Sequence, residues 1–163
     1  MKAVEVAKKY IGEKELVNNS GFVSAEFQKK MIGVGWIKGQ AWCCYFAELV
    51  WKEAYPDLRG IFDRLFAPSA TATYKNFDVD KDFTVSKVPV PGALAVWRQG
   101  TGWQGHIGVV QEIIGDTFKC IEGNTNSEGG REGIEVAVKN RKVDYKVGAN
   151  KLNLIGFVIP PKQ

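Results

Sequence analysis

The sequence is poor in the residues that build metal centres and disulfide frameworks. It contains one histidine, His106, and three cysteines, of which Cys43 and Cys44 are adjacent while Cys120 lies far along the chain. An odd, sparse set of this kind is not a disulfide framework, so we expect free thiols. Multi-histidine metal sites are excluded, and adjacent cysteines on different faces of a helix cannot easily complete one tetrahedron. We therefore expect no metal and no cofactor.

Long apolar runs are missing as well. The longest, such as 41–47, fall far short of the roughly 18 residues that a membrane span needs, so we expect no membrane insertion. Residues 1–12 carry four charged side chains and thus lack the apolar core and cleavage site of a secretory signal. We expect synthesis in the cytoplasm without a signal peptide, and release or delivery by another system for any action outside.

No strong excess of one charge is present. The 22 lysine and arginine residues and 18 aspartate and glutamate residues give a net charge of +4. Nucleic-acid binding usually shows a stronger basic stripe and a recognisable module, so we expect no nucleic-acid partner. A modest attraction to a polyanionic surface stays open. One local cluster, which we interpret as a solvated basic face, comprises Lys139, Arg141, Lys142 and Lys146, interrupted by Asp144.

Length and composition favour a single globular domain over residues 1–163, with 45% hydrophobic and 25% charged residues. Ser24 and Ser69 are candidate helix N-caps. Apolar spacing predicts helices over about 4–11, 24–34, 42–54, 58–66 and 69–77.

The second half of the chain reads as extended segments. Residues 78–87 look irregular, and Gly115 and Asp116 form a hairpin signal. Helices followed by an antiparallel meander imply an α+β domain in which a helix packs on the sheet. The predicted strands are 93–97, 106–113, 117–122, 134–138 and 154–159.

Cys43 is the better nucleophile candidate of the two adjacent thiols. It begins the third predicted helix, where free backbone N–H groups and the positive end of the helix dipole favour a thiolate. It shares a helical face with Phe46 and Val50, which should meet the sheet, whereas Cys44 shares its side with Glu48. The alternative is that Cys43 is a small buried hydrophobe.

His106 begins a predicted strand after the glycine-rich segment 100–105, so we expect its ring at a sheet edge that faces a helix terminus. Glu122 and Asn124 close the next strand, and as i and i+2 neighbours they should project to one face. One of them can orient the imidazole, which fixes its tautomer and supports the imidazolium. Their alternative role is turn formation before the Gly129–Gly130 loop.

Four segments resemble, in order, the CHAP family of cysteine, histidine-dependent amidohydrolases and peptidases. They are 41–46 (AWCCYF), 91–97 (PGALAVW), 105–110 (GHIGVV) and 121–126 (IEGNTN). The likeness covers almost the whole chain. It implies a papain-like α+β domain of the CHAP/NlpC type, in which N-terminal helices pack on an antiparallel sheet and a cysteine at a helix start meets a histidine on the sheet.

The resemblance also implies roles for individual residues. Carried over one by one, Cys43 is the nucleophile and His106 the base. Glu122 is the orienting acid, and Asn124 is a further polar member of the site. Cys44 stands where the family often has a small residue, so two thiols compete for the nucleophile position.

Aromatic faces stack on sugars and peptides, which makes tryptophans near the site candidates for substrate contact. Trp103, in the glycine-rich segment just before His106, is the strongest candidate. Trp42 and Gln104 complete the predicted substrate-binding set. Trp36 and Trp97 stay open, with core packing as the alternative for Trp97.

The resemblance implies a peptidoglycan hydrolase that cuts an amide bond, and we expect a monomer. The bond is either the N-acetylmuramoyl-L-alanine amide or one within the stem peptide or cross-bridge, and the context is lysis by a phage endolysin or a wall-degrading effector, hence an antimicrobial activity. Two other readings stay open. One is a cytosolic amidase acting on a small amide, such as a glutathione–polyamine conjugate. The other is a catalytically silent wall-binding module.

Overall fold

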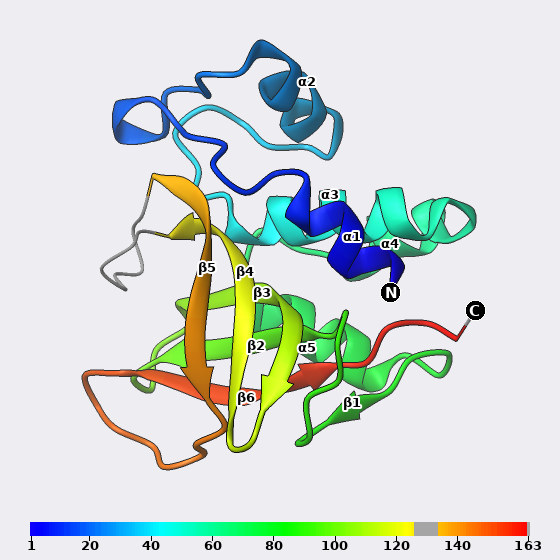
Figure 1. Cartoon of the computed structure of the whole chain (residues 1–163), viewed down its shortest axis with the longest axis vertical. Helices are drawn as coiled ribbons and strands as arrows, with labels where there is room; N and C mark the ends of the chain where they lie inside the picture. The colour runs from blue at the N-terminus through cyan, green and yellow to red at the C-terminus, as the bar shows by residue number, and fades with distance from the viewer. Residues whose placement is uncertain (126–133, 163) are drawn as a thin grey trace.

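A computed structural model describes residues 1–125 and 134–162, and it shows helices packed on a curved sheet (Figure 1). The predicted loop at Gly129 and Gly130 lies outside these residues. The helices in the described part are α1 (Lys2–Lys8), α2 (Ala25–Gly33), α3 (Cys43–Ala54), α4 (Arg59–Leu65) and α5 (Ala70–Val79). The strands there are β1 (Val85–Ser86), β2 (Leu94–Gln99), β3 (Gly105–Ile114), β4 (Thr117–Thr125), β5 (Glu135–Lys142) and β6 (Leu152–Val158).

Two of the helices, α2 and α5, begin where their predicted capping serines place them. The Ser24 hydroxyl accepts a hydrogen bond from the backbone N–H of Phe27 at 3.2 Å, and the Ser69 hydroxyl accepts one from Ala72 at 3.3 Å. Each bond satisfies one of the N–H groups that the first helical turn leaves without a partner. The second cap fixes the start of α5, which contacts β2 and β3.

The sheet has the strand order β1-β6-β2-β3-β4-β5, and every neighbouring pair is antiparallel. Strands β2 to β5 form the predicted meander, with Gly115 in the left-handed region at the β3–β4 hairpin. The meander prediction is wrong for β6, which returns across the sheet and pairs with β2 instead of β5. The expectation of an irregular 78–87 is also wrong, because Val85 pairs with Val158 to form β1.

Apolar side chains cover both faces of the sheet. On one face, residues such as Val96, Ile107 and Ile121 join the core that the helices complete. On the other face, a second cluster forms around Phe118 and Phe157, with their rings 5.4 Å apart at a steep angle. Partly buried residues, among them Val90, Val143 and Leu152, pack against this second cluster.

Helix α3 is the central element, because it is buried on nearly all sides. Its last turn holds Trp51, whose ring contacts Phe62 of α4 and Phe77 of α5. Its first turn lies against β4, where a Cβ atom on Gly123 would stand 2.7 Å from the Phe46 Cβ atom. The first turn of α3 is thus fixed against the sheet with no room for a side chain between them.

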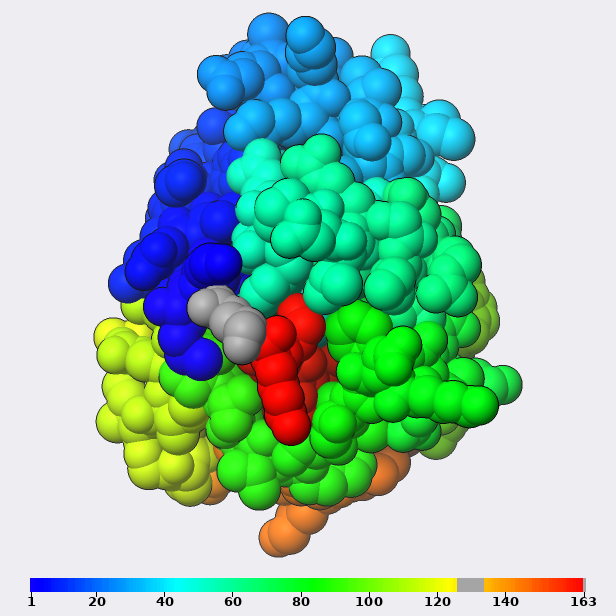
Figure 2. Space-filling view, turned by 90° about the vertical axis from the view of Figure 1, so that its right-hand side faces the viewer, coloured from blue at the N-terminus to red at the C-terminus, as the bar shows by residue number. Residues whose placement is uncertain are grey.

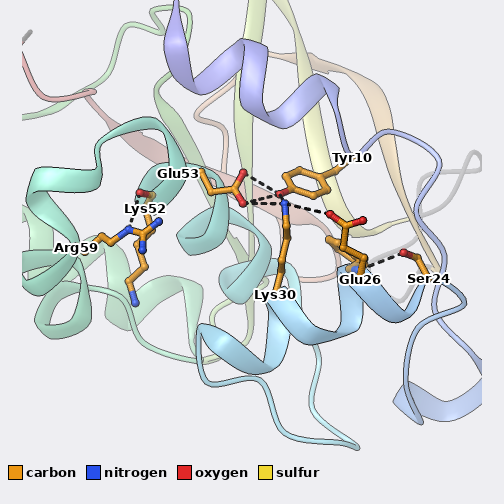
Figure 3. A network of polar contacts seen from close by, with 8 residues as sticks. Tyr10, Ser24, Glu26, Lys30, Lys52, Glu53 and Arg59 are labelled. Atoms are coloured by element: carbon orange, nitrogen blue, oxygen red, sulfur yellow. Dashed lines mark hydrogen bonds and ion pairs between the residues drawn. The ribbon is translucent and has the colours of Figure 1, made fainter.

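A polar network joins the N-terminal segment, α2 and α3 (Figure 3). The Tyr10 hydroxyl lies 2.8 Å from the carboxylate of Glu53 and accepts a hydrogen bond from Lys30 Nζ at 2.8 Å. Lys30 also lies 3.1 Å from Glu53. Burial is the main cause that raises the pKa of Tyr10 to about 12, so the phenol stays protonated and donates to Glu53. The network holds α2, the helix farthest from the sheet in Figure 1, against α3.

The N-terminal helix and the C-terminal residues lie side by side on one face (Figure 2). Gly92 stands between them, since a Cβ atom there would lie 3.7 Å from Ala3 and 3.8 Å from Pro160. Among the described residues, no helix has the length and apolar character needed to cross a membrane.

Candidate active site

The predicted nucleophile and base lie in one pocket. Cys43 is the first residue of α3 and His106 the second residue of β3, and both line a pocket of about 110 Å³. The pocket lies where the starts of α3, α5 and β3 converge. Backbone N–H groups at the start of α3 have no partner within the helix, so they are available beside the thiol. All three cysteines, Cys120 included, are free, as the sequence predicts.

The histidine ring is held by the next strand. His106 is buried, and its Nε2 atom lies 2.7 Å from Oε2 of Glu122, the predicted orienting acid. Its Nδ1 atom is buried and has no hydrogen-bond partner among the described residues. Because Nε2 is occupied by the carboxylate, Nδ1 is the nitrogen that remains for Cys43.

Glu122 has a second partner, on β5. Arg141 Nε donates to Glu122 Oε1 at 2.7 Å, and Arg141 Nη2 donates to Oε2 at 2.7 Å. Such a two-point contact is the strongest form of arginine–carboxylate pairing. It satisfies a carboxylate that is completely buried, which would otherwise be costly.

The contacts shift the pKa values of the site in a consistent direction. A hydrogen bond from Cys44 is the largest cause that holds the pKa of the Cys43 thiol well below its usual range, against the effect of burial. The neighbouring His106 ring, its positive charge and the backbone N–H of Ile107 act in the same direction. The contact with Cys43 and burial raise the pKa of Cys44 well above its usual range. Of the two adjacent thiols, these contacts favour the ionised form at Cys43 and disfavour it at Cys44.

The histidine and its acid are shifted in opposite directions. Burial lowers the pKa of His106, but the charge of Glu122 and the contact with Cys43 outweigh it and raise the pKa to about 9. Burial raises the pKa of Glu122, but the charge of His106 and the hydrogen bonds of Arg141 outweigh it and lower the pKa to about 2. At neutral pH these shifts favour a thiolate, an imidazolium and a carboxylate in one chain of contacts.

A family model for the CHAP domain matches residues 35–124, just over half of the chain. The chain belongs to the CHAP family. The matched residues run from before Cys43 to Asn124 and include His106 and Glu122, while Arg141 lies beyond them. No curated protein and no solved structure matches the chain. Membership confirms the predicted papain-like α+β fold and implies a cysteine- and histidine-dependent amidohydrolase or peptidase of the peptidoglycan-degrading type.

Asn124 reaches the CHAP pocket through an irregularity of β4. The prediction that Glu122 and Asn124 project to one face assumes a regular strand. The β4–β5 register shifts between Glu122 and Thr125, and Asn124 has a left-handed φ of 53°. Asn124 consequently lines the pocket, whereas Glu122 contacts His106 and Arg141 without reaching the pocket. Unusual backbone of this kind is common at functional sites.

The path of Glu122 to the histidine depends on Gly108. A Cβ atom at Gly108 would lie 2.6 Å from Glu122 Cγ and 2.6 Å from Cys120 Sγ. Both contacts are shorter than side-chain atoms tolerate. A glycine at this position of β3 therefore leaves the space that the carboxylate side chain occupies.

The predicted substrate-binding residues fall into two groups. Trp103 is 75% exposed, lines the pocket, and is anchored through its carbonyl, which accepts a hydrogen bond from Thr71 at 2.9 Å. Gln104 also lines the pocket and is exposed. The prediction for Trp42 is wrong, because its side chain is 0% exposed and packs against Phe22 and other aromatic rings.

Trp36 and Trp97 are buried too, so among the five tryptophans only Trp103 is free to contact a ligand. Trp36 donates its indole N–H to the carbonyl of Gln40 at 2.9 Å. Trp97 pairs with His106 across β2 and β3, and the two rings lie 5.9 Å apart. The core-packing alternative for Trp97 is therefore correct.

The interpretation of 139–146 as a solvated basic face is wrong for two of its members. The Arg141 side chain is only 17% exposed, and Lys139 is buried. Sequence reasoning missed Arg141 because it stands opposite Phe118 in the β4–β5 register and reaches Glu122 only through its long side chain. The available signal was chemical, since a buried carboxylate on β4 needs a cationic partner on a neighbouring strand.

Metal ligation has no support in the described residues. No three histidine, cysteine, aspartate or glutamate side chains within 1–125 and 134–162 come together as a group that could hold an ion. The polar side chains around the pocket instead form the linear chain from Cys43 through His106 to Glu122 and Arg141.

Proposed function

We propose that this CHAP protein is a peptidoglycan hydrolase that cleaves an amide bond with Cys43 as nucleophile. The observation that carries the proposal is the shared pocket of Cys43 and His106, in which Glu122 occupies the far nitrogen of the ring at 2.7 Å. An activated thiol requires a base that is held by a third group, and these residues supply both. The family match supports the wall as the substrate class.

The first half of the reaction is acyl transfer to sulfur. The Cys43 thiolate attacks the carbonyl carbon, a C–S bond forms, and the negative charge moves to the carbonyl oxygen. Backbone N–H groups at the start of α3 are placed to stabilise this oxyanion. Protonated His106 gives its proton to the leaving nitrogen, the C–N bond breaks, and the amine departs from a thioester.

The second half regenerates the enzyme. Neutral His106 takes a proton from water, the resulting hydroxide adds to the thioester carbonyl, and the C–S bond breaks to release a carboxylic acid. The sulfur leaves as the thiolate and the imidazolium is restored. Glu122 accepts the Nε2 hydrogen throughout, which keeps Nδ1 as the nitrogen that exchanges protons.

The pocket also fits a peptide-like ligand. The small residues Ala41, Ala70 and Gly105 leave a narrow space beside the thiol, and Trp103 is exposed at the rim. A flat aromatic ring in this position suits stacking on a sugar or on a peptide unit next to the scissile bond. Gln104 supplies an amide for hydrogen bonding at the same rim.

The test is mass spectrometry of soluble fragments released from purified sacculi. Wild type should release fragments, and Cys43→Ala should release none while keeping the circular-dichroism spectrum of the wild type. New ends at the bond between the glycan and the stem peptide would identify an N-acetylmuramoyl-L-alanine amidase. New ends within the peptide would identify an endopeptidase. The matched variant Cys44→Ala should retain turnover, with activity reduced on the acidic side because Cys44 no longer donates to the thiolate.

Two outcomes would contradict the proposal. Fragment release by folded Cys43→Ala would exclude Cys43 as the nucleophile. No release from sacculi of several wall chemistries would favour the small-amide amidase if the thiol is reactive, and the silent wall-binding module if it is not.

A further inference from the structure

The chain of contacts behind the nucleophile continues past the acid. Glu122 is fully buried, and both of its oxygens are bound by Arg141 at 2.7 Å while one of them also accepts from His106 at 2.7 Å. Arg141 comes from β5, whereas Glu122 comes from β4. The orientation of the acid therefore depends on a residue of a separate strand.

The Trp97 ring contacts both Arg141 and His106, the two partners of Glu122. The Arg141 guanidinium carbon lies 5.0 Å from the centroid of the Trp97 ring, a cation–π distance. The same ring lies 5.9 Å from the His106 ring, tilted by 34°. Trp97 is itself buried. Arginine, tryptophan and histidine consequently form a packed layer around the Glu122 carboxylate.

Charge balance gives the arginine a role beyond packing. The titratable groups that face one another here are Cys43 and Cys44 of α3, His106 of β3, Cys120 and Glu122 of β4, and Arg141 of β5.

When Cys43 is a thiolate and His106 an imidazolium, Cys43 and Glu122 carry two negative charges. The positive charges of His106 and Arg141 together balance them. Without Arg141 the buried group would carry a net negative charge. Burial of an unmatched charge is costly, so the group would take up a proton. That proton would go to the thiolate or to the carboxylate, and either outcome reduces the reactive form.

We propose, building on the hydrolase function above, that Arg141 is a positioning residue of this CHAP site. It keeps Glu122 ionised and aimed at His106, and it balances the buried charge so that the Cys43 thiolate persists at mildly acidic pH. Arg141 touches neither the pocket nor the thiol and acts through Glu122.

The experiment measures the rate of Cys43 alkylation by iodoacetamide between pH 4 and pH 9, with peptide mass spectrometry to assign the modified cysteine. In Arg141→Met, the midpoint of the rate should move at least one pH unit upward. That shift corresponds to a roughly tenfold slower reaction below the midpoint. Arg141→Lys keeps the charge but loses the two-point contact, so its midpoint should stay near that of the wild type. Arg98→Met, an exposed arginine on β2, is the matched control and should behave as wild type.

If Arg141 had only a structural role, the dependence of the Cys43 alkylation rate on pH would differ from this expectation. Arg141→Met would then react more slowly at every pH, or identically to wild type, with an unchanged midpoint, and either result would overturn the proposal. If Arg141→Met does not fold, Arg141→Lys decides, because a midpoint shifted as far as one unit despite the retained charge contradicts charge balance.

The assay needs no substrate, so it is independent of which bond the enzyme cuts. Failure to release wall fragments would leave the alkylation profiles unaffected. Conversely, an unshifted profile would remove the role of Arg141 and leave Cys43-dependent fragment release standing.

Discussion

His106 is the residue through which the acid and the nucleophile influence each other. It is the only histidine of the chain, so it gives a single set of imidazole resonances in an NMR spectrum. Burial alone would hold its pKa below the ordinary value of about 6.5, and Glu122 and Cys43 reverse this effect. The protonation of the site can therefore be followed at one residue.

We predict that His106 titrates at a pH of about 9 in the wild type. Glu122→Gln removes the negative charge but keeps the shape, so burial is less opposed and the midpoint should fall by at least one unit. An imidazolium is needed to protonate the leaving amine, so the alkaline limb of activity should follow this midpoint downward. NMR titration of both proteins checks the shift, and equal midpoints would contradict the role given to Glu122.

At this scale the sequence predicts much of the site. Cys43 was identifiable because it begins an amphipathic helix, and His106 because no other histidine exists. Glu122 and Asn124 followed from the CHAP resemblance and strand spacing, although their different placement depends on a strand irregularity. Arg141 and the burial of Trp42 were not predictable, because both follow from tertiary packing between distant segments.

The relation between α3 and β4 determines where the thiol stands. Gly123 lets the helix approach the strand, since a Cβ atom there would lie 2.7 Å from both the Phe46 Cβ and the Trp42 Cζ3 atoms. Phe46 and Trp42 are completely buried, so neither has free space to move into. The distance between Cys43 and the strand that carries Glu122 is therefore set by the packing of these two buried side chains against the Gly123 backbone.

We predict that Gly123→Ala lowers the free energy of unfolding by about 1–3 kcal/mol, the usual cost of overpacking a core. It should also displace the first turn of α3, and so slow Cys43 alkylation at pH 6. Urea denaturation and alkylation kinetics measure the two effects. Gly60→Ala is the control, because a Cβ atom there meets nothing within 4 Å. A Gly123→Ala protein with wild-type stability and reactivity would contradict the close-approach argument.

The errors at the element scale have physical causes. Strand β1 has two residues, too short to show the alternation by which strands are recognised. Strand β5 continues to Lys142 through polar residues, because pairing with β4 stabilises them as strand. The position of β6 between β1 and β2 follows from long-range pairing, for which chain order gives no signal. The helices, by contrast, are local structures, and the apolar spacing placed all five of those described; only α2 and α5 also have a capping serine.

At the scale of the whole molecule, the helices and the sheet share one hydrophobic core, which runs from Ala3 of α1 to Val158 of β6. The proposed nucleophile, Cys43, belongs to the helical layer, whereas His106, Glu122 and Arg141 belong to three adjacent strands. The reactive site exists only where these layers meet. The expectation of one domain over 1–163 stays a prediction, as do the monomeric state and the route to the wall.

The ionisation of Cys43 at mildly acidic pH should be lost when the protein unfolds and the helices separate from the sheet. At pH 6 we expect a larger fraction of Cys43 to be ionised in the folded protein than in the unfolded chain, because Cys44 and His106 hold its pKa well below the usual range. An unfolded cysteine has a pKa of about 8.5 and is almost entirely a neutral thiol at that pH. Folding should thus be accompanied by formation of one thiolate.

The most direct measurement is the ultraviolet absorbance of the thiolate between pH 4 and pH 9, recorded as the difference between wild type and Cys43→Ala. The account predicts a thiolate signal that is already present at pH 6 in the native protein and disappears at that pH in denaturant. A native signal that develops only near pH 8.5 or above would show that Cys43 is an ordinary buried thiol, and would contradict the assignment of Cys43 and His106 as a reactive pair.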